Sequence, residues 1–159
     1  MYFFKKNFLY FLLILCFLVL FIAYYIEYIL GHQPCKLCLI ERIPYIITIL
    51  AILFVLKFKD YEKKVYILIS ILFLISIIIS LYHLGIELNI FEETIFCSVD
   101  NQGKILSKEE LLNLLNKPAI SCKNVTFKLF GLSLTSYNIL LSLIILLNSI
   151  KFYREYEKN

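Results

Sequence analysis

The run FLYFLLILCFLVLFIAYYI, residues 8–26, decides the fold class because it contains no charged residue. A bilayer core of about 30 Å requires about 20 apolar residues in a helix. Three further apolar runs follow, at about 43–56, 65–84 and 134–150. Hydrophobic residues make up 61% of the chain, whereas a soluble domain is about half apolar. The sequence therefore predicts an all-α membrane protein with a bundle of four transmembrane helices.

We expect these helices at about 8–27, 40–57, 65–84 and 134–151, in a single domain that covers residues 1–159. The second is long enough only if it begins near Leu39 and carries Arg42 at the membrane interface, where arginine can snorkel. Pro44 then falls just past its first turn and can kink it. The first run is too long for a cleaved signal peptide and has no small-x-small cleavage site, so we interpret it as a retained helix.

The basic residues predict the orientation. Nine of the 16 lie in three short segments: the two ends of the chain and KFKDYEKK, residues 57–64. By the positive-inside rule, both termini and this connection face the cytoplasm. A short loop at about 28–39 and a long loop at about 85–133 then face outward, into the periplasm of a bacterial inner membrane. The net charge of +4 is modest and suggests no nucleic-acid partner.

The long outer loop is expected to hold its own short helix. In LSKEELLNLL, residues 106–115, Ser107 and Glu110 form a capping box and the leucines supply one apolar face. Pro118 ends this helix. The stretch 91–103 has no clear periodicity, so Cys97 should be more exposed than Cys122.

Four of the five cysteines lie on the outer side, and Cys16 lies in the middle of the first helix, where we interpret it as a small buried hydrophobic residue. Because the outer side is oxidising, the four outer cysteines should pair. Of three possible pairings, the simplest is Cys35–Cys38 in the short loop and Cys97–Cys122 in the long loop.

The C-x-x-C of HQPCKLCLIERIP, residues 32–44, allows three kinds of chemistry. Haem attachment fails because Leu39, not histidine, follows Cys38. A zinc site made of four cysteines normally uses two close pairs, and the second pair here is widely split. A redox pair fits best, because Cys38 near a helix N-terminus and Arg42 one turn later would stabilise a thiolate. No resident metal is predicted.

The position of this pair at the lipid boundary suits a lipid-soluble oxidant such as a quinone. Arg42 could hydrogen-bond a quinone carbonyl. Alternatively, Arg42 anchors the helix at the interface or pairs with Glu41.

These residues resemble the DsbB family of bacterial disulfide bond formation proteins. The resemblance lies in PCKLCLIER (34–42), YHLGIE (82–87), Cys97 and CKNVTFKLFGLSLTSYN (122–138), and it covers nearly the whole chain in the same order. Vitamin K epoxide reductases also have four helices and a C-x-x-C, but they place the C-x-x-C after the loop cysteines.

The resemblance implies a thiol oxidase that reoxidises a periplasmic DsbA-type, thioredoxin-like protein and reduces ubiquinone or menaquinone. Cys97 would be attacked first and would release Cys122. Cys122 would attack Cys35 and free Cys38 next to the quinone, with Arg42 assisting.

His83 matches a family position near the quinone, although it could equally be a helix-end histidine bonded to backbone. We expect Glu27, His32 and Glu87 to be structural residues of the interface. The alternatives are a vitamin K epoxide reductase-like enzyme with another thiol donor, and a non-enzymatic scaffold with structural disulfides or zinc.

Overall fold

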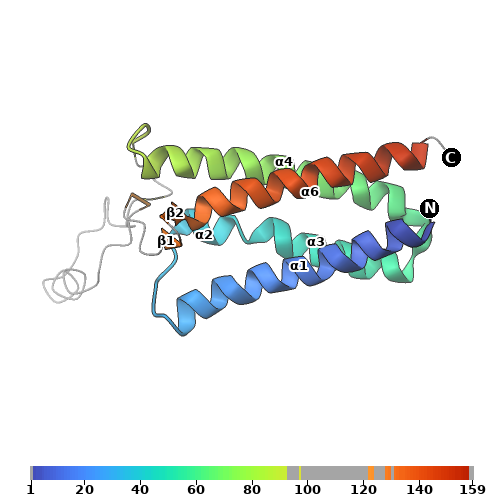
Figure 1. Ribbon diagram of the computed structural model, residues 1–159, viewed down its shortest axis with the longest axis horizontal. Helices are drawn as coiled ribbons and strands as arrows, with labels where there is room; N and C mark the ends of the chain where they lie inside the picture. The colour runs from blue at the N-terminus through green and yellow to red at the C-terminus, as the bar shows by residue number, and fades with distance from the viewer. Residues whose placement is uncertain (1, 93–96, 98–121, 124–127, 130, 158–159) are drawn as a thin grey trace, which may run out of the picture.

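The computed structural model describes residues 2–92, 97, 122–123, 128–129 and 131–157. Over these residues the chain forms long helices that run side by side (Figure 1). The elements are α1 (Tyr2–Tyr28), α2 (Lys36–Ile40), α3 (Ile43–Lys57), the 3-10 turn η1 (Lys59–Tyr61), α4 (Glu62–Glu87), the strands β1 (Lys128–Leu129) and β2 (Leu132–Ser133), and α6 (Leu134–Glu157).

Within the residues that the structure describes, four segments are long and apolar enough to cross a membrane, namely Asn7–Tyr28, Lys36–Lys57, Lys59–Glu87 and Leu134–Glu155. The predicted all-α bundle of four membrane helices is therefore confirmed. Both termini lie at one end of the bundle, and α2 with the two short strands lies at the other (Figure 1). The helix predicted at 106–115 lies outside the described residues, and the single domain over 1–159 stays a prediction.

The second membrane segment is broken between α2 and α3, as the position of Pro44 allowed. Pro44 lies in the first turn of α3 and has no N–H to donate to a carbonyl in α2. The chain makes a turn at Glu41 and Arg42 instead, where the Arg42 N–H bonds the Leu39 carbonyl at 3.2 Å. As a result, the charged side chains of Glu41 and Arg42 project from a bend and not from one regular helix.

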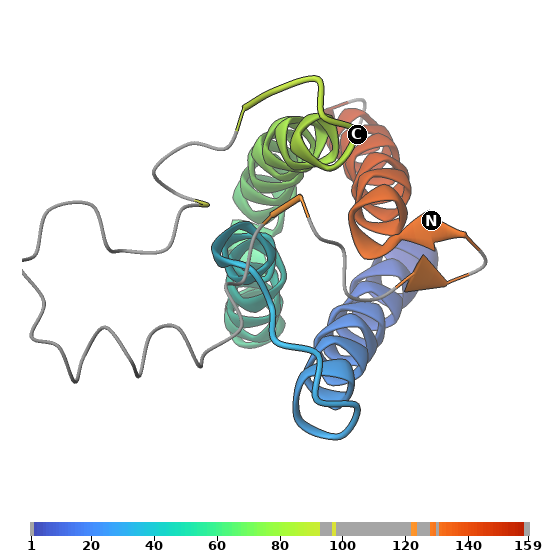
Figure 2. The ribbon, with the colours of Figure 1, turned by 90° about the vertical axis from the view of Figure 1, so that its left-hand side faces the viewer.

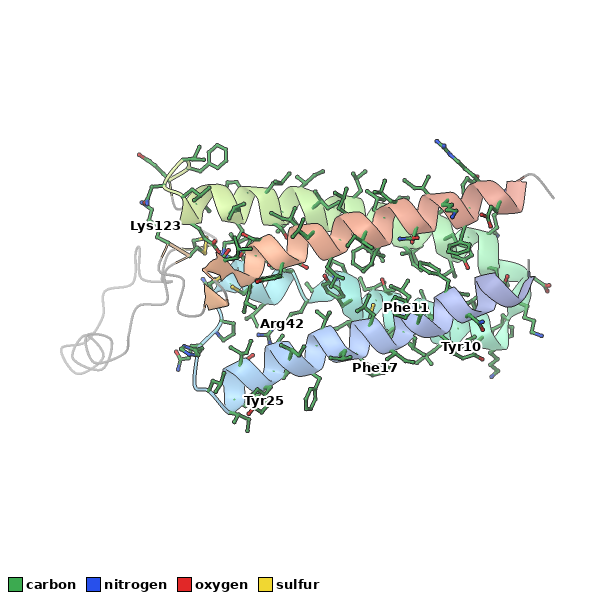
Figure 3. The ribbon with its side chains drawn as sticks, in the orientation of Figure 1. Tyr10, Phe11, Phe17, Tyr25, Arg42 and Lys123 are labelled. Atoms are coloured by element: carbon green, nitrogen blue, oxygen red, sulfur yellow. A yellow bond between two sulfur atoms is a disulfide. The ribbon has the colours of Figure 1, made fainter. Side chains whose placement is uncertain are left out.

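Viewed along the bundle, the helices form a ring in which α4 lies between α3 and α6 (Figure 2). Its interior is filled by apolar side chains from all four helices, including Leu12, Cys16, Ile52, Phe73 and Ile145. Cys16 is fully buried there, as expected. The outward side chains are also large and apolar, among them Phe11, Phe17 and Tyr25 (Figure 3). Since lipid is as apolar as the core, close packing and interhelical hydrogen bonds hold such helices together.

A polar stripe runs along the contact between α4 and α6. The serines and histidine of α4 at positions 76, 80 and 83 recur every three or four residues, so they share one face of the helix. Facing them, the Asn138 amide donates to the Ser80 hydroxyl at 2.7 Å and accepts a hydrogen bond from the Tyr45 hydroxyl at 2.5 Å. The Ser76 and Ser142 hydroxyls lie 3.3 Å apart. This stripe leads toward the end of the bundle that carries the cysteines.

Two helix ends shape that end of the bundle. After α1, Gly31 takes a φ of 72°, a left-handed conformation that glycine adopts without strain. After α4, Asn89 takes a φ of 58°, which asparagine tolerates better than most residues, and the Ile90 N–H closes the helix on the Gly85 carbonyl at 2.8 Å. Helix α4 is therefore longer than predicted, and Glu87 belongs to it rather than to the loop.

Candidate functional site

The C-x-x-C motif forms the start of α2, with Cys35 as its N-cap. The backbone N–H of Cys38 donates to the Cys35 sulfur at 3.2 Å, so this sulfur takes the place of the oxygen in an ordinary cap. The helix begins earlier than predicted, and Cys38 lies inside its first turn. The prediction that the helix end stabilises a thiolate at Cys38 is wrong, because the helix end faces the sulfur of Cys35.

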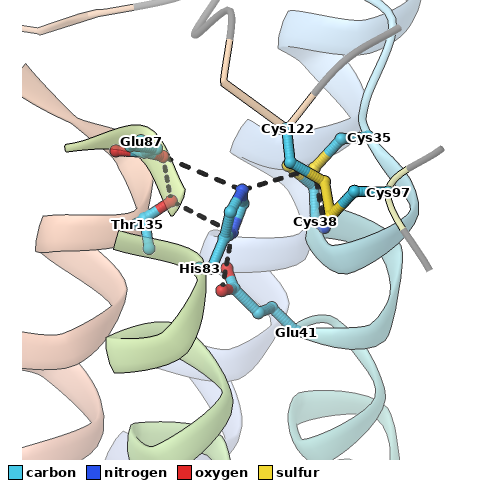
Figure 4. The surroundings of a disulfide bond; sticks show 8 residues. All are labelled: Cys35, Cys38, Glu41, His83, Glu87, Cys97, Cys122 and Thr135. Carbon is cyan, nitrogen blue, oxygen red and sulfur yellow. Dashed lines mark hydrogen bonds and ion pairs between the residues drawn. A yellow bond between two sulfur atoms is a disulfide. The ribbon is translucent and has the colours of Figure 1, made fainter. Parts of the chain in front are cut away.

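His83, in α4, lies against Cys35 and is almost completely buried, with 2% of its surface exposed. Its Nε2 is 3.5 Å from the Cys35 sulfur, and its Nδ1 is 3.0 Å from a carboxylate oxygen of Glu41. Figure 4 shows the ring between these two groups. The alternative of a helix-end histidine bonded to backbone is not what the structure has, since both ring nitrogens face side chains.

Thr135, at the start of α6, completes the surroundings of this ring. Its hydroxyl donates to Glu87 at 2.7 Å and lies 3.3 Å from His83 Nδ1. Because that hydroxyl proton goes to Glu87, the threonine oxygen can only accept from Nδ1, as the Glu41 carboxylate also does. Both contacts therefore require a proton on Nδ1, and Nε2 of the neutral ring is left as an acceptor directed at Cys35.

These contacts act on the ionisation of Cys35. A hydrogen bond from the Cys38 side chain is the largest cause that lowers the pKa of Cys35, from 9.0 to about 5. Burial opposes the change, and the hydrogen bond and charge of His83 add to it. The site therefore favours the thiolate of Cys35, which is the form that attacks disulfides and binds metals.

A disulfide joins Cys97 to Cys122, with a Cα–Cα distance of 5.6 Å. Cys97 and Cys122 are 3% and 2% exposed, so both are buried and the expected difference in exposure between them is negligible. They pack against Cys35 and the apolar side chains of Leu37 and Ile86. These side chains bury the disulfide against the end of the helix bundle.

The two cysteine pairs meet at one point (Figure 4). The sulfurs of Cys35 and Cys122 and a ring nitrogen of His83 all lie within 4.8 Å of one another. Cys35 and Cys38 are free thiols, so the expected disulfide between them is not formed in the redox state of this structure. The arrangement places a thiol with a lowered pKa beside a disulfide, which is the geometry that thiol–disulfide exchange needs.

Arg42 lies on the other side of the bend, away from Glu41. Its guanidinium bonds the carboxylate of Glu27 in α1 at 2.5 Å and lies 4.9 Å from the centre of the Tyr24 ring. The proposed pairing of Arg42 with Glu41 is therefore wrong, because Glu41 bonds His83. Glu27 is more than a general interface residue: it fixes the position of Arg42.

Sequence reasoning missed Glu41 and Thr135 as parts of the site. The signal for Glu41 was available, because an ionisable side chain within a membrane segment usually has a partner and a function. Thr135 carried no such signal, since threonine is common in membrane helices and its role depends on how α6 packs against α4. Glu87 and His83 were named, but their shared contact with Thr135 was not.

Comparison with known proteins agrees with this geometry. Residues 5–151 match the family described as disulfide bond formation protein DsbB. An uncharacterized protein of Rickettsia prowazekii (strain Madrid E) is 36% identical over 140 residues, which cover 86% of this chain and 81% of that protein. The matched range includes the two cysteine pairs, the carboxylates at positions 27, 41 and 87, and His83.

Proposed function

Because this chain belongs to the DsbB family of membrane proteins that form disulfide bonds, we propose that it reoxidises a periplasmic DsbA-type, thioredoxin-like protein and passes the electrons to a membrane quinone. Thiol oxidoreductase activity in general follows from the family. The soluble partner, the quinone (ubiquinone or menaquinone), the bacterial inner membrane and the cytoplasmic termini are parts of the proposal.

The single observation that carries the proposal is the contact between the two pairs. The Cys35 sulfur lies within 4.8 Å of the Cys122 sulfur, although the two residues belong to different loops. A disulfide that served only to hold the fold together would not need a thiol of lowered pKa beside it. This contact provides the step by which electrons move from the long loop to the C-x-x-C.

The proposed exchange proceeds in balanced steps, beginning with the enzyme in which both pairs are oxidised. A partner thiolate attacks Cys97 and breaks its bond to Cys122. The second thiol of the partner then displaces Cys97, so the partner leaves oxidised and the Cys97–Cys122 pair is reduced. The Cys122 thiolate attacks Cys35 and releases Cys38, and Cys97 then displaces Cys35 from Cys122. The result is an oxidised Cys97–Cys122 pair with two free thiols at Cys35 and Cys38, the redox state of this structure.

His83 has a defined part in these steps. Its Nε2 is 3.5 Å from the Cys35 sulfur and can take the proton when the Cys35 thiol ionises. The Nδ1 contacts to Glu41 and Thr135 hold the ring in the tautomer that makes this possible, and the Glu41 carboxylate stabilises the charged ring that results.

The surroundings of Cys38 fit a quinone. Cys38 is half-buried, and the neighbouring side chains of Leu39 and Ile43 are exposed, so an apolar ring can approach from the bilayer. Arg42 carries five N–H donors, of which one contacts Glu27, so it can also bond a carbonyl oxygen. A bound quinone would supply the electron sink, taking up two electrons and two protons as Cys35 and Cys38 become a disulfide.

Trapping of a partner tests the proposal. A DsbA-type protein that lacks its resolving cysteine should form a stable mixed disulfide with the chain, lost in Cys97→Ser and kept in Cys35→Ser. Reduced partner should also drive quinone reduction by the unmodified protein but not by either variant. A scaffold with structural disulfides would trap no partner. Trapping that survives in Cys97→Ser and is lost in Cys35→Ser would reverse the order of the two pairs.

A further inference from the structure

Three side chains at the junction of the two cysteine pairs have the donor atoms of a metal site. These are Cys35, His83 and Cys122, whose ligand atoms all lie within 4.8 Å of one another. All three are buried, so a bound ion would be shielded from water. Two thiolate sulfurs and one imidazole nitrogen form the kind of soft set that selects zinc rather than magnesium or calcium.

The distance between the ligand atoms of Cys35 and His83 agrees with tetrahedral zinc coordination. Bond lengths of about 2.3 Å for Zn–S and about 2.05 Å for Zn–N place a sulfur and a nitrogen ligand about 3.6 Å apart at the tetrahedral angle. The distance between Cys35 Sγ and His83 Nε2 is 3.5 Å. One edge of the coordination tetrahedron therefore exists before any ion binds, and only Cys122 needs to approach more closely.

The second ring nitrogen of His83 is already bonded as metal-binding histidines usually are. Nδ1 is 3.0 Å from the Glu41 carboxylate, and zinc-binding histidines characteristically donate their other N–H to a carboxylate or carbonyl. Glu87 adds a second negative charge, 3.8 Å from Nε2. The negative charges around His83 therefore favour the binding of a cation once the thiols of Cys35 and Cys122 are free to ionise.

The redox state controls this site. While Cys122 is bonded to Cys97, its sulfur is no thiolate and cannot complete the set. We propose that the fully reduced protein binds one Zn²⁺ through Cys35, His83 and Cys122, and that the bound ion stops thiol exchange. This inference rests on the proposed function, because turnover with a dithiol partner supplies the reduction of Cys97–Cys122.

Binding involves no change of oxidation state. Zn²⁺ takes the place of the protons of the two thiols, and a water molecule or a further thiol fills the fourth position. While coordinated, neither sulfur can attack a disulfide or be oxidised to one. The ion therefore holds the reduced protein out of the cycle until it is removed, which makes zinc an inhibitor rather than a structural element of the fold.

Cobalt absorption tests the site directly. The full chain carrying Cys16→Ala, purified in detergent, is reduced with a phosphine, freed of reductant and titrated with Co²⁺. One Co²⁺ per chain with the visible absorption of tetrahedral thiolate coordination is expected for the reduced protein and none for the oxidised protein. Zn²⁺ should displace it. At a zinc concentration of about 100 times the dissociation constant, about 1% of chains stay free, so disulfide re-formation should slow about 100-fold.

The two histidines of the chain give a matched pair of variants. His83→Ala should abolish cobalt binding, whereas His32→Ala should leave it unchanged. Glu41→Gln should weaken it by about 10- to 100-fold, as is usual when the partner of a metal-bound histidine is lost. Re-formation of the Cys97–Cys122 disulfide after oxidation shows that each variant is folded.

Two results would overturn the site: no cobalt bound by the reduced protein, or the same binding in His83→Ala. Partner trapping separates this inference from the proposed function. A chain that traps the partner but binds no ion refutes the zinc site alone. A chain that binds the ion but traps no partner refutes the oxidase function, and with it the inhibitory role of zinc.

Discussion

Cys35 should remain a thiolate well below neutral pH. The hydrogen bond from the Cys38 side chain, with a further contribution from His83, lowers the pKa of Cys35 from 9.0 to about 5. Since the thiolate is the reactive form, a thiol with a pKa of about 5 loses about a tenth of its reactivity between pH 8 and pH 6, whereas a thiol with a pKa of 9.0 loses about 90-fold. The reactivity of Cys35 should thus be nearly flat above pH 6 and should fall only as the pH approaches 5.

Two matched variants isolate the largest cause of this shift. Both carry Cys16→Ala, so that Cys35 is the one thiol left once Cys97 and Cys122 are paired. Cys38→Ser keeps a hydroxyl that can donate to the Cys35 sulfur, and Cys38→Ala removes it. A hydrogen bond to a charged group is worth about 1.5–3 kcal/mol, and one pKa unit is about 1.4 kcal/mol. The pKa of Cys35 should therefore be about 1–2 units higher in Cys38→Ala than in Cys38→Ser.

The assay is the rate at which a small thiosulfonate modifies Cys35 between pH 4 and pH 9, followed by mass spectrometry of the peptide that ends at Lys36. Unfolded protein provides the reference for an ordinary thiol. A midpoint near pH 9 in Cys38→Ser would show that the folded site does not stabilise the thiolate. Equal midpoints in the two variants would instead show that the Cys38 side chain is not its main cause.

Two further substitutions test the contacts on either side of the bend. Arg42→Lys keeps the charge but loses the planar donors. We expect the KM for quinone to rise by about ten-fold, equivalent to about 1.4 kcal/mol, while the rate of thiol exchange with the partner stays unchanged. Unaltered quinone kinetics would leave Arg42 as an anchor held by Glu27. Tyr45→Phe removes the hydrogen bond to Asn138 and should lower the free energy of unfolding by about 0.6 kcal/mol, the average for interhelical bonds in membranes, and by no more than about 1.7 kcal/mol, the maximum there. Thermal unfolding should show a smaller loss for Ser76→Ala, whose bond is longer, and the reverse order would contradict this ranking.

The fold was largely predictable because membrane helices obey strong rules. The length and apolar character of each run are sufficient to find the four spans, and Pro44 marked the bend between α2 and α3. The ends of the helices were less predictable. Helix α4 continues through Glu87 and closes where the Ile90 N–H bonds the Gly85 carbonyl. The contact of Glu87 with the distant Thr135 hydroxyl leaves no trace in the local sequence.

The cysteines were predictable for a similar reason, since a C-x-x-C together with two further loop cysteines has few uses if the loops face an oxidising compartment, as we propose. Their order of reactivity was not. Placing the stabilised thiolate at Cys38 assumed that the helix began after it, whereas α2 begins at Lys36 and is capped by Cys35. One helical turn decides which sulfur faces the helix end, and predicted helix boundaries are not accurate to one turn.

Glu41 and Arg42 make different contacts at the bend between α2 and α3. On a regular helix, two adjacent residues already point about 100° apart and do not face each other, which argues against a local pair. At the bend before Pro44, Glu41 points toward α4 and fixes the tautomer of His83, while Arg42 points toward α1 and is held by Glu27. The two neighbours therefore place a negative charge beside His83, where it can act on the Cys35 proton, and a positive charge on another side, where it is available to the proposed electron acceptor. Both are needed for the proposed reaction, and placing them side by side would let each neutralise the other.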